Sequence, residues 1–272
     1  MSAVLDAPQP RLPSQSAWQR RIELVRLSAV RQLRSRYRGS ALGVLWSFAN
    51  PVLLTMMYTL LFGSAFASSY GGSTTRYVVS AFVAVVVVTF FLQATSEALV
   101  SVVANGGLLN KIAIDPETFP FASVAANAFQ QALTTFPAML IVSLVITHDP
   151  VRVILVPIVL AAVVAMAAGF GIALAALYVF FRDLSYLWAV MGFLLWMTSP
   201  VFYPAALVPE SIRAYLVVNP VAISIAAVRE VTIDRGPLDA GTIGLFIAVA
   251  AGFAILGHLL FRGLRREFMD LL

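Results

Sequence analysis

The chain has 272 residues, of which 60% are hydrophobic and 11% charged, and its mean hydropathy is +0.90. Soluble globular domains lie far from this composition, so the sequence predicts an integral membrane protein. The net charge of +5 does not indicate a nucleic-acid partner, because the basic residues flank apolar runs, where anionic lipid headgroups are the simpler partner. The sequence contains no cysteine, which excludes disulfides, thiolate chemistry and cysteine metal sites.

Six runs of the chain carry no charge, and each has at least the roughly 20 residues that cross a hydrocarbon core of about 30 Å. These runs are 39–75, 77–96, 118–148, 153–181, 184–209 and 240–261. They place the spans at about Leu42–Ala67, Tyr77–Leu99, Pro120–Ile146, Val153–Phe181, from Leu187 onward, and Thr242–Phe261. Because a β-barrel would instead show short alternating strands, we predict an all-α membrane protein with six transmembrane helices.

The first 16 residues lack a continuous apolar core, so they are not expected to be a signal peptide. We expect 1–16 to be a disordered N-terminal tail and 17–272 to form one transmembrane domain. Positive charges are concentrated before the first span, in every second connection and in the C-terminal tail. Because Lys and Arg are held back on the cytoplasmic side during insertion, both termini are expected in the cytoplasm.

Ahead of the first span, apolar residues recur at helical spacing among arginines. These residues are Trp18, Ile22, Val25, Ala29 and Leu33. The pattern predicts a basic amphipathic helix along the inner membrane interface, which we call the collar. The collar is either a topogenic signal or an element that controls lateral access from the inner leaflet.

The first two spans contain three polar or helix-breaking residues of interest. Asn50 and Pro51 lie about a third of the way across the first span, where proline frees a backbone carbonyl. They mark either a structural kink or a substrate contact. Glu97 is expected at the cytoplasmic end of the second span, where it can pair with Lys111 or with an arginine of the collar.

Residues 105–119 form the main cytoplasmic connection inside the chain. A glycine pair, mixed charge and the Asp115-Pro116 step predict a short helix bounded by turns. This segment either docks a partner or is a plain surface loop. The third and fourth spans that follow are rich in Ala, Gly and Val, which allow helix backbones to approach closely.

The fifth span is expected to lose its regularity at Ser199-Pro200. Asn219-Pro220 then interrupts a stretch that is too short for a clean crossing. We therefore predict that 204–228 forms short helices that re-enter the outer leaflet between spans five and six. Irregular backbone at that depth is tolerated where it lines a wet cavity, so this region is the best sequence pointer to a translocation exit.

Several kinds of chemistry are missing from the sequence. Lys111, the only lysine, lacks the glycine-rich context of a phosphate-binding loop. His148 and His258 are expected on opposite sides of the membrane, so they do not predict a metal site. The central membrane layer has no carboxylate for ion coupling. A chain that moves a substrate without these groups is expected to take its energy from another subunit.

Motifs along the chain resemble those of a known family. The run RSRYRGSALGVLWSFANP at 34–51 resembles the entry into the first span of type-2 ABC permeases that export polysaccharides such as O-antigen, capsule and teichoic acid. Later features agree in order: Asn110-Lys111 through Phe119-Pro120, Phe181-Arg182-Asp183-Leu184, Ser199-Pro200-Val201-Phe202-Tyr203, Asn219-Pro220 and Arg229. The resemblance covers about 20–272.

The resemblance implies a homodimeric permease in a bacterial cytoplasmic membrane, with two separate ATPase subunits that bind ATP and Mg²⁺. This chain would hold no cofactor or metal. Lipid-linked glycan would enter beside the collar, where Arg34, Arg36 and Arg38 are expected to hold the carrier pyrophosphate. Candidate pathway aromatics are Tyr58, Phe62, Phe90, Phe91, Trp196 and Tyr203. Asn110, Lys111, Asp115, Pro116 and Glu117 are expected in the coupling helix that contacts the ATPase.

Two alternatives remain at this point. A type-2 ABC exporter of drugs or lipids has the same architecture and carries a small hydrophobic cargo. An intramembrane enzyme, such as a lipid transferase, needs polar catalytic groups near one interface, and only Glu97, Arg182, Asp183 and Arg229 qualify.

Overall fold

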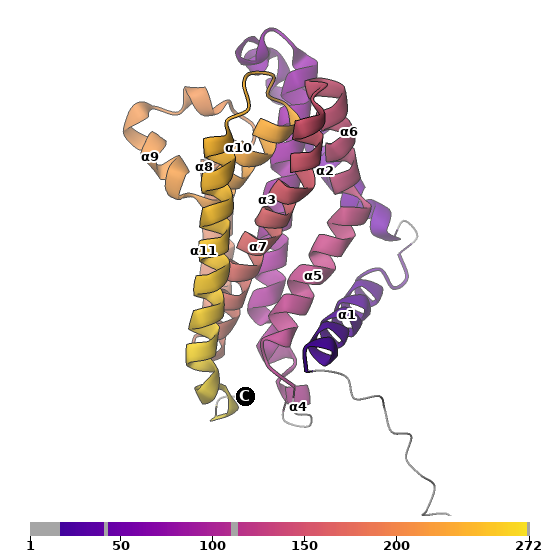
Figure 1. The fold of residues 1–272 in the computed structure, drawn as a ribbon, viewed down its shortest axis with the longest axis vertical. Coiled ribbons are helices and arrows are strands. Elements are labelled where there is room, and N and C mark those ends of the chain that lie inside the picture. The colour runs from indigo at the N-terminus through magenta and orange to yellow at the C-terminus, as the bar shows by residue number, and fades with distance from the viewer. Residues whose placement is uncertain (1–16, 41–42, 110–113, 271–272) are drawn as a thin grey trace, which may run out of the picture.

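A computed structural model describes residues 17–40, 43–109 and 114–270, and all of their regular structure is helical (Figure 1). The helices are α1 (Ala17–Arg36), α2 (Trp46–Phe66), α3 (Thr74–Ala104), α4 (Gly106–Leu109), α5 (Thr118–Leu133), α6 (Thr135–Thr147), α7 (Pro150–Phe180), α8 (Leu184–Thr198), α9 (Glu210–Val218), α10 (Pro220–Thr232) and α11 (Ala240–Leu264). Short 3₁₀ turns cover Gly43–Leu45, Ala67–Tyr70, Ala205–Leu207 and Arg265–Asp270. The predicted tail 1–16 lies outside the described residues.

The all-α membrane architecture is confirmed, whereas the expected six crossings stay a prediction. Within the described residues, four helical stretches are long and apolar enough to cross a membrane: Gly43–Tyr70, Thr74–Ala104, Pro150–Phe180 and Ala240–Phe268. The bent pair α5 and α6 makes a fifth crossing if it is counted as one span. The α8 helix has 15 residues, and at 1.5 Å per residue it is shorter than a core of about 30 Å.

The third span is bent rather than straight. Its two parts, α5 and α6, meet at Thr134 and their axes differ by 48°. The cause is Pro137, which has no N–H for the carbonyl of Leu133 and whose ring crowds that carbonyl. The hydroxyl of Thr134 donates to the carbonyl of Gln130 at 2.9 Å and so satisfies one backbone acceptor beside the break.

The centre of the bundle is formed by α3 and α7, against which most other helices pack. The expected close approach of small residues is confirmed where α7 meets α11. A Cβ atom on Gly169 would collide with the backbone at Phe253, and one on Gly257 would collide with the backbone of Gly169. Gly171 packs in the same way on α3, because a Cβ there would lie 2.7 Å from the Cβ of Ala98.

The chain after α8 forms the short helices that the sequence predicts. Proline and a capping side chain set where these helices end and begin. The α8 helix ends at Thr198, directly before Ser199-Pro200. The Asn219 carboxamide oxygen accepts from the backbone N–H groups of Val221 (2.9 Å) and Ala222 (3.2 Å), and so caps α10. Figure 1 shows α10 inside the bundle and α9 extending to its side. Re-entry of this region into a membrane stays a prediction.

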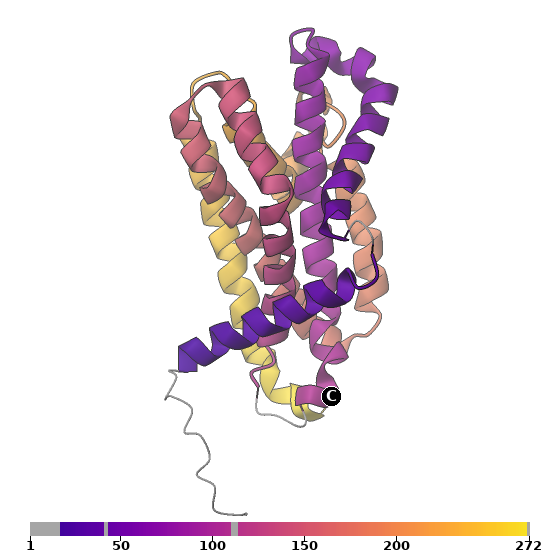
Figure 2. The same ribbon diagram turned by 90° about the vertical axis from the view of Figure 1, so that its right-hand side faces the viewer.

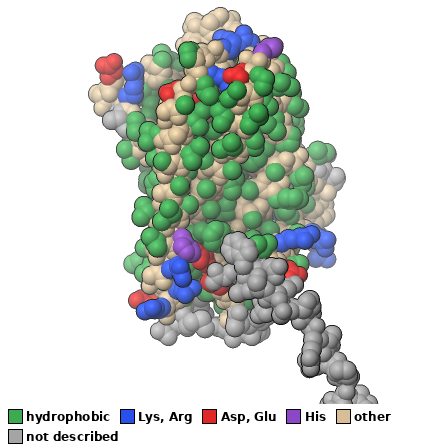
Figure 3. All heavy atoms as spheres, in the orientation of Figure 1, with side chains coloured by type: hydrophobic (Ala, Val, Ile, Leu, Met, Phe, Trp, Pro, Cys, Tyr) green, Lys and Arg blue, Asp and Glu red, His purple; other side chains and the backbone are tan. Residues whose placement is uncertain are grey.

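The collar forms as expected. It is helix α1, which Figure 2 shows lying obliquely across the lower part of α5. Ala29 is buried in this contact, whereas Ile22 and Leu27 are exposed. On the face shown in Figure 3, hydrophobic side chains cover the middle and charged side chains lie near the two ends. This distribution suits a protein whose middle is surrounded by hydrocarbon.

Candidate functional site

The three collar arginines point in different directions. Arg36 turns into the protein, where its Nη1 donates to Gln130 Oε1 at 2.7 Å and to Asn127 Oδ1 at 3.2 Å. Its Nη2 forms an ion pair with Glu97. Arg34 and Arg38 are instead exposed. The structure therefore separates Arg36 from the two arginines that were expected to act with it.

Glu97 is the centre of a hydrogen-bonded group that joins three helices. Its Oε2 accepts from Asn127 Nδ2 at 2.9 Å, and its Oε1 accepts from Gln93 Nε2 at 3.3 Å. We call Arg36, Gln93, Glu97, Asn127 and Gln130 the polar cluster. The Arg36 and Glu97 side chains are 21% and 26% exposed, so water screens their attraction less than at an open surface. The expected pairing of Glu97 with a collar arginine is confirmed.

A polar cavity of about 180 Å³ adjoins this cluster. Its lining is Tyr37, Trp46, Ser47, Asn50, Pro51, Thr89, Gln93, Gln130 and Gln131. The Tyr37 and Ser47 hydroxyls lie 2.6 Å apart and connect the end of the collar to α2. Asn50 reaches this cavity rather than a purely apolar surface. Hydroxyl and amide groups at this point can hydrogen-bond a polar group that enters between α2, α3 and α5.

The 105–119 segment contains the short helix α4, as the sequence predicts. Asn110 and Lys111 lie outside the described residues. Arg265 Nη1 lies 3.5 Å from Asp115 Oδ2, and Glu117 is hydrogen-bonded to His258 Nδ1. Both carboxylates of the expected coupling helix therefore contact the C-terminal end of the chain.

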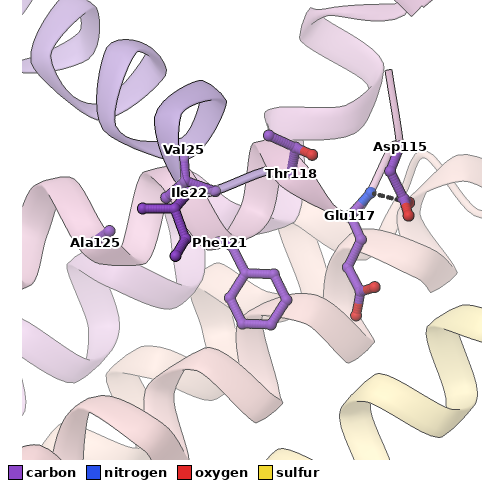
Figure 4. A pocket seen from close by; sticks show the side chains of 7 residues that line it. All are labelled: Ile22, Val25, Asp115, Glu117, Thr118, Phe121 and Ala125. Carbon is purple, nitrogen blue, oxygen red and sulfur yellow. Dashed lines mark hydrogen bonds between the residues drawn. The ribbon is translucent and has the colours of Figure 1, made fainter. Parts of the chain in front are cut away.

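A mainly apolar groove of about 240 Å³ lies between the collar and the start of α5, next to this segment (Figure 4). Its lining is Ile22, Val25, Asp115, Glu117, Thr118, Phe121 and Ala125. Pro116 comes just before α5, and its carbonyl accepts from the N–H of Phe119 at 3.3 Å. The collar and the 105–119 segment thus adjoin one surface.

Three of the six expected pathway aromatics form one contiguous group with Phe202. Tyr58 stacks on Phe202, with ring centroids 3.4 Å apart, and on Phe62 at 6.3 Å. Trp196 lies 6.1 Å from Phe202. We call Tyr58, Phe62, Trp196 and Phe202 the aromatic strip; its residues come from α2, α8 and the turn after α8. Phe202 was part of a recognised motif, but the sequence did not single it out for the pathway.

The other three expected aromatics lie elsewhere. Tyr203 is half-buried, donates its hydroxyl to the carbonyl of Thr198 at 2.9 Å and lines an apolar pocket beside α9. Phe90 and Phe91 are 1% and 0% exposed inside the chain's own core. In this conformation the two rings do not reach the protein surface, where a substrate could touch them. Their role in the pathway therefore stays a prediction.

The amide members of the polar cluster were missed by the sequence reasoning, although a signal existed. Ser123, Asn127 and Gln130 recur at helical spacing along one side of α5, and Thr134 continues the spacing at its C-cap. A polar stripe on an otherwise apolar helix indicates a face that contacts polar groups. In residues 17–40, 43–109 and 114–270, no group of three His, Cys, Asp or Glu residues is placed to hold a metal ion.

Comparisons with known proteins agree with the motifs. Residues 23–233 match the family described as ABC-2 type transporter. A relative from Klebsiella pneumoniae, an O-antigen export system permease protein RfbA, is 25% identical over 244 residues, which are 89% of this chain and 92% of the relative. A protein of the same description from Myxococcus xanthus is 26% identical over 243 residues, which are 88% of this chain and 92% of that protein. Because the family match covers more than half of its length, this chain belongs to the ABC-2 type transporter family.

Proposed function

We propose that this chain is the membrane-spanning subunit of an ATP-driven exporter that moves lipid-linked polysaccharide across a bacterial cytoplasmic membrane. The observation that carries the proposal is the similarity to O-antigen export permeases along nearly nine-tenths of the chain and 92% of theirs. Two copies of the chain act with two ATPase subunits, and both termini lie in the cytoplasm.

Membership of the family makes the chain a multi-pass membrane component that works with an ATPase subunit. ATP and Mg²⁺ bind that subunit, and hydrolysis takes place there. The chain's own contribution is therefore to admit the substrate, surround it and respond to the movement of the ATPase.

Admission of the substrate is assigned to the collar. A lipid-linked glycan presents an anionic pyrophosphate at the inner interface, and a planar guanidinium binds such a group through two parallel hydrogen bonds. Arg34 and Arg38 are exposed and available for this contact. Arg36 already donates to Asn127 and Gln130 and pairs with Glu97, so its role is to hold the collar in place.

Passage of the glycan is assigned to the side of the chain formed by α2 and α8. Sugars bind to aromatic faces through their C–H surfaces and to amide or hydroxyl groups through hydrogen bonds. The aromatic strip and the polar cavity offer these two surfaces on neighbouring parts of α2. A second copy facing this side encloses the pathway.

Deletion of the gene in its own bacterium tests the function. Surface glycan is expected to disappear and the lipid-linked glycan to accumulate inside, and the intact gene on a plasmid should restore export. Unchanged surface glycan together with new sensitivity to hydrophobic drugs would favour an exporter of drugs or lipids instead. A purified chain that associates with no ATPase subunit would contradict the proposal.

A further inference from the structure

The C-terminal end of α11 folds under the bundle and is anchored by two aromatic rings. Phe261 and Phe268 are both 0% exposed, and their rings meet edge to face with centroids 5.2 Å apart. Phe268 also meets Phe180, the last residue of α7, at 5.9 Å. Burying aromatic rings in this way fixes the turn Arg265–Asp270 to the end of the bundle at which α7 ends.

The same small core holds the flanks of the 105–119 segment. Leu109 and Phe119 are 6% and 5% exposed and belong to one hydrophobic cluster with Phe261 and Phe268. This cluster is separate from the main core of the bundle. The described parts of the segment, 105–109 and 114–119, are therefore packed together with the C-terminal turn as one unit.

Two polar contacts reinforce this unit. Glu117 is 5% exposed and pairs with His258 of α11, and Arg265 lies 3.5 Å from Asp115. Figure 4 shows the Glu117 carboxylate pointing away from α1. A carboxylate so enclosed depends on its partner, because an uncompensated charge is costly there. The two contacts thus tie the 105–119 segment to both the last turns and the end of α11.

These ties extend into the membrane part of the protein. The segment is covalently joined to α3 and α5, and the two polar contacts connect it to α11 as well. In turn, α11 touches α7 backbone to backbone at Gly257 and Gly169. A displacement of the segment is consequently passed to α11 and α7 as well as to its own two helices.

We propose that His258 and the turn Arg265–Phe268 form a brace that holds the 105–119 segment and transmits its movement to α11. The inference rests on the proposed function, in which that segment receives the movement of the ATPase. Asp115 and Glu117 are then positioning residues that hold the segment on α11. Contact with the ATPase falls to exposed positions such as Gly107.

Three single variants of the complex with its ATPase subunit test the brace. Arg265→Glu reverses the charge opposite Asp115, His258→Leu removes the hydrogen-bond partner of Glu117, and Arg265→Lys is the conservative change. Arg262→Glu is the matched control, because Arg262 is exposed on the same helix and has no ion pair among the described residues. Each complex is measured for bound ATPase, ATP hydrolysis, glycan export and amide hydrogen exchange in 105–109.

A partly exposed ion pair contributes up to about 1 kcal/mol, which is a factor of about five in an equilibrium. In Arg265→Glu, the Leu108 and Leu109 amides are therefore expected to exchange about fivefold faster. In His258→Leu they should exchange at least that much faster, because the enclosed Glu117 carboxylate loses its partner. Both variants should export less glycan per ATP. Bound ATPase should be unchanged, and Arg265→Lys and Arg262→Glu should behave like the original chain.

Two results would overturn the brace. One is unchanged exchange and unchanged glycan per ATP in both disruptive variants. The other is loss of bound ATPase, which would mean that these residues contact the ATPase directly. If the original complex hydrolyses ATP but exports no glycan, the proposed function fails instead. The amide exchange rates alone then show whether the brace holds the segment.

Discussion

Arg34 and Arg38 are the exposed guanidinium groups next to the point where the collar meets α2. Replacing both with Lys keeps the positive charge but removes the two-pronged geometry that suits a pyrophosphate. We expect normal insertion and at least a tenfold loss of export, because about 1.4 kcal/mol of lost binding corresponds to tenfold. Surface glycan beside a membrane-fraction blot measures both effects. Equal export by the doubly substituted chain would remove the pyrophosphate assignment.

Glu97 accepts hydrogen bonds from three side chains of the polar cluster, so its loss affects all three. Glu97→Leu removes one acceptor from each of Arg36, Asn127 and Gln93. A hydrogen bond to a charged group contributes about 1.5–3 kcal/mol, so the free energy of unfolding should fall by about that amount. Denaturant unfolding in detergent measures this loss. Ser96→Ala, at an exposed neighbouring position, is the control and should leave stability within about 0.5 kcal/mol.

Asp239 supplies a pH-dependent contribution at the start of α11. The Thr242 hydroxyl donates to its Oδ2 at 2.6 Å, and the N–H groups of Thr242 and Gly241 donate to Oδ1, so the pKa of Asp239 lies below its ordinary value. The folded state thus favours the carboxylate. Its stabilisation is present above the ordinary pKa of about 3.9 and is lost as the pH falls through the lower folded value.

The variant Asp239→Asn keeps a capping side chain but cannot titrate. It should therefore melt at a lower temperature than the original chain near pH 7, and the difference should shrink as the pH falls below about 4. Melting in detergent across this range measures the effect. Asp183→Asn is the control, because Asp183 stands at the start of α8 without a side-chain capping bond. An equal, pH-independent effect at both positions would contradict the assignment.

At the scale of helices, the contact between α7 and α11 depends on the absence of side chains at two glycines. Gly257→Leu places atoms where the backbone of Gly169 lies, so the helices must separate. Overpacking of this kind costs about 1–3 kcal/mol. Gly252→Leu is the matched control, because a Cβ there meets nothing within 4 Å. Thermal unfolding should distinguish the two variants, and equal melting temperatures would show that the close approach contributes little.

Helix ends were predictable where a local sequence signal acts alone. Ser199-Pro200 ends α8, and Asn219 caps α10, because proline and a capping carboxamide act on their own backbone. Pro137 is the same kind of local signal for the bend between α5 and α6. The uncharged run 118–148 nevertheless predicted one span, because the run is long. A long apolar run indicates that the chain crosses, and it does not show that the helix is straight.

Side-chain partners were less predictable, because they depend on which helices meet. Arg34 and Arg36 lie about 200° apart around a helix, so the spacing alone already placed them on opposite sides. It did not show that the inward side faces Glu97 and Asn127, which come from α3 and α5. The burial of Phe90 likewise depends on how α3 packs against its neighbours. Lys111 lies outside the described residues, so its expected position stays a prediction.

At the scale of the whole molecule, the side formed by α2 and α8 differs from the other membrane-facing surfaces. Only 11% of the most apolar stretch of α2 is buried, against 67% in α3. This side also carries the aromatic strip and adjoins the polar cavity. The large exposed hydrophobic side chains of α2 include Trp46, Phe48 and Phe62 beside aliphatic ones. Those of α11, such as Leu256 and Leu259, are instead aliphatic, which suits lipid. A second copy is therefore expected to cover α2 rather than α11.

Single cysteines test this arrangement directly, because the sequence has none of its own. Leu60→Cys on α2 and Leu256→Cys on α11 start from side chains that are 87% and 64% exposed. If two copies face each other across α2, oxidation or a short bifunctional thiol reagent should join the Leu60→Cys chains into dimers in native membranes. The Leu256→Cys chain should stay monomeric on a denaturing gel. Cross-linking from α11 with none from α2 would place the second copy, and with it the glycan pathway, on the opposite side of the bundle.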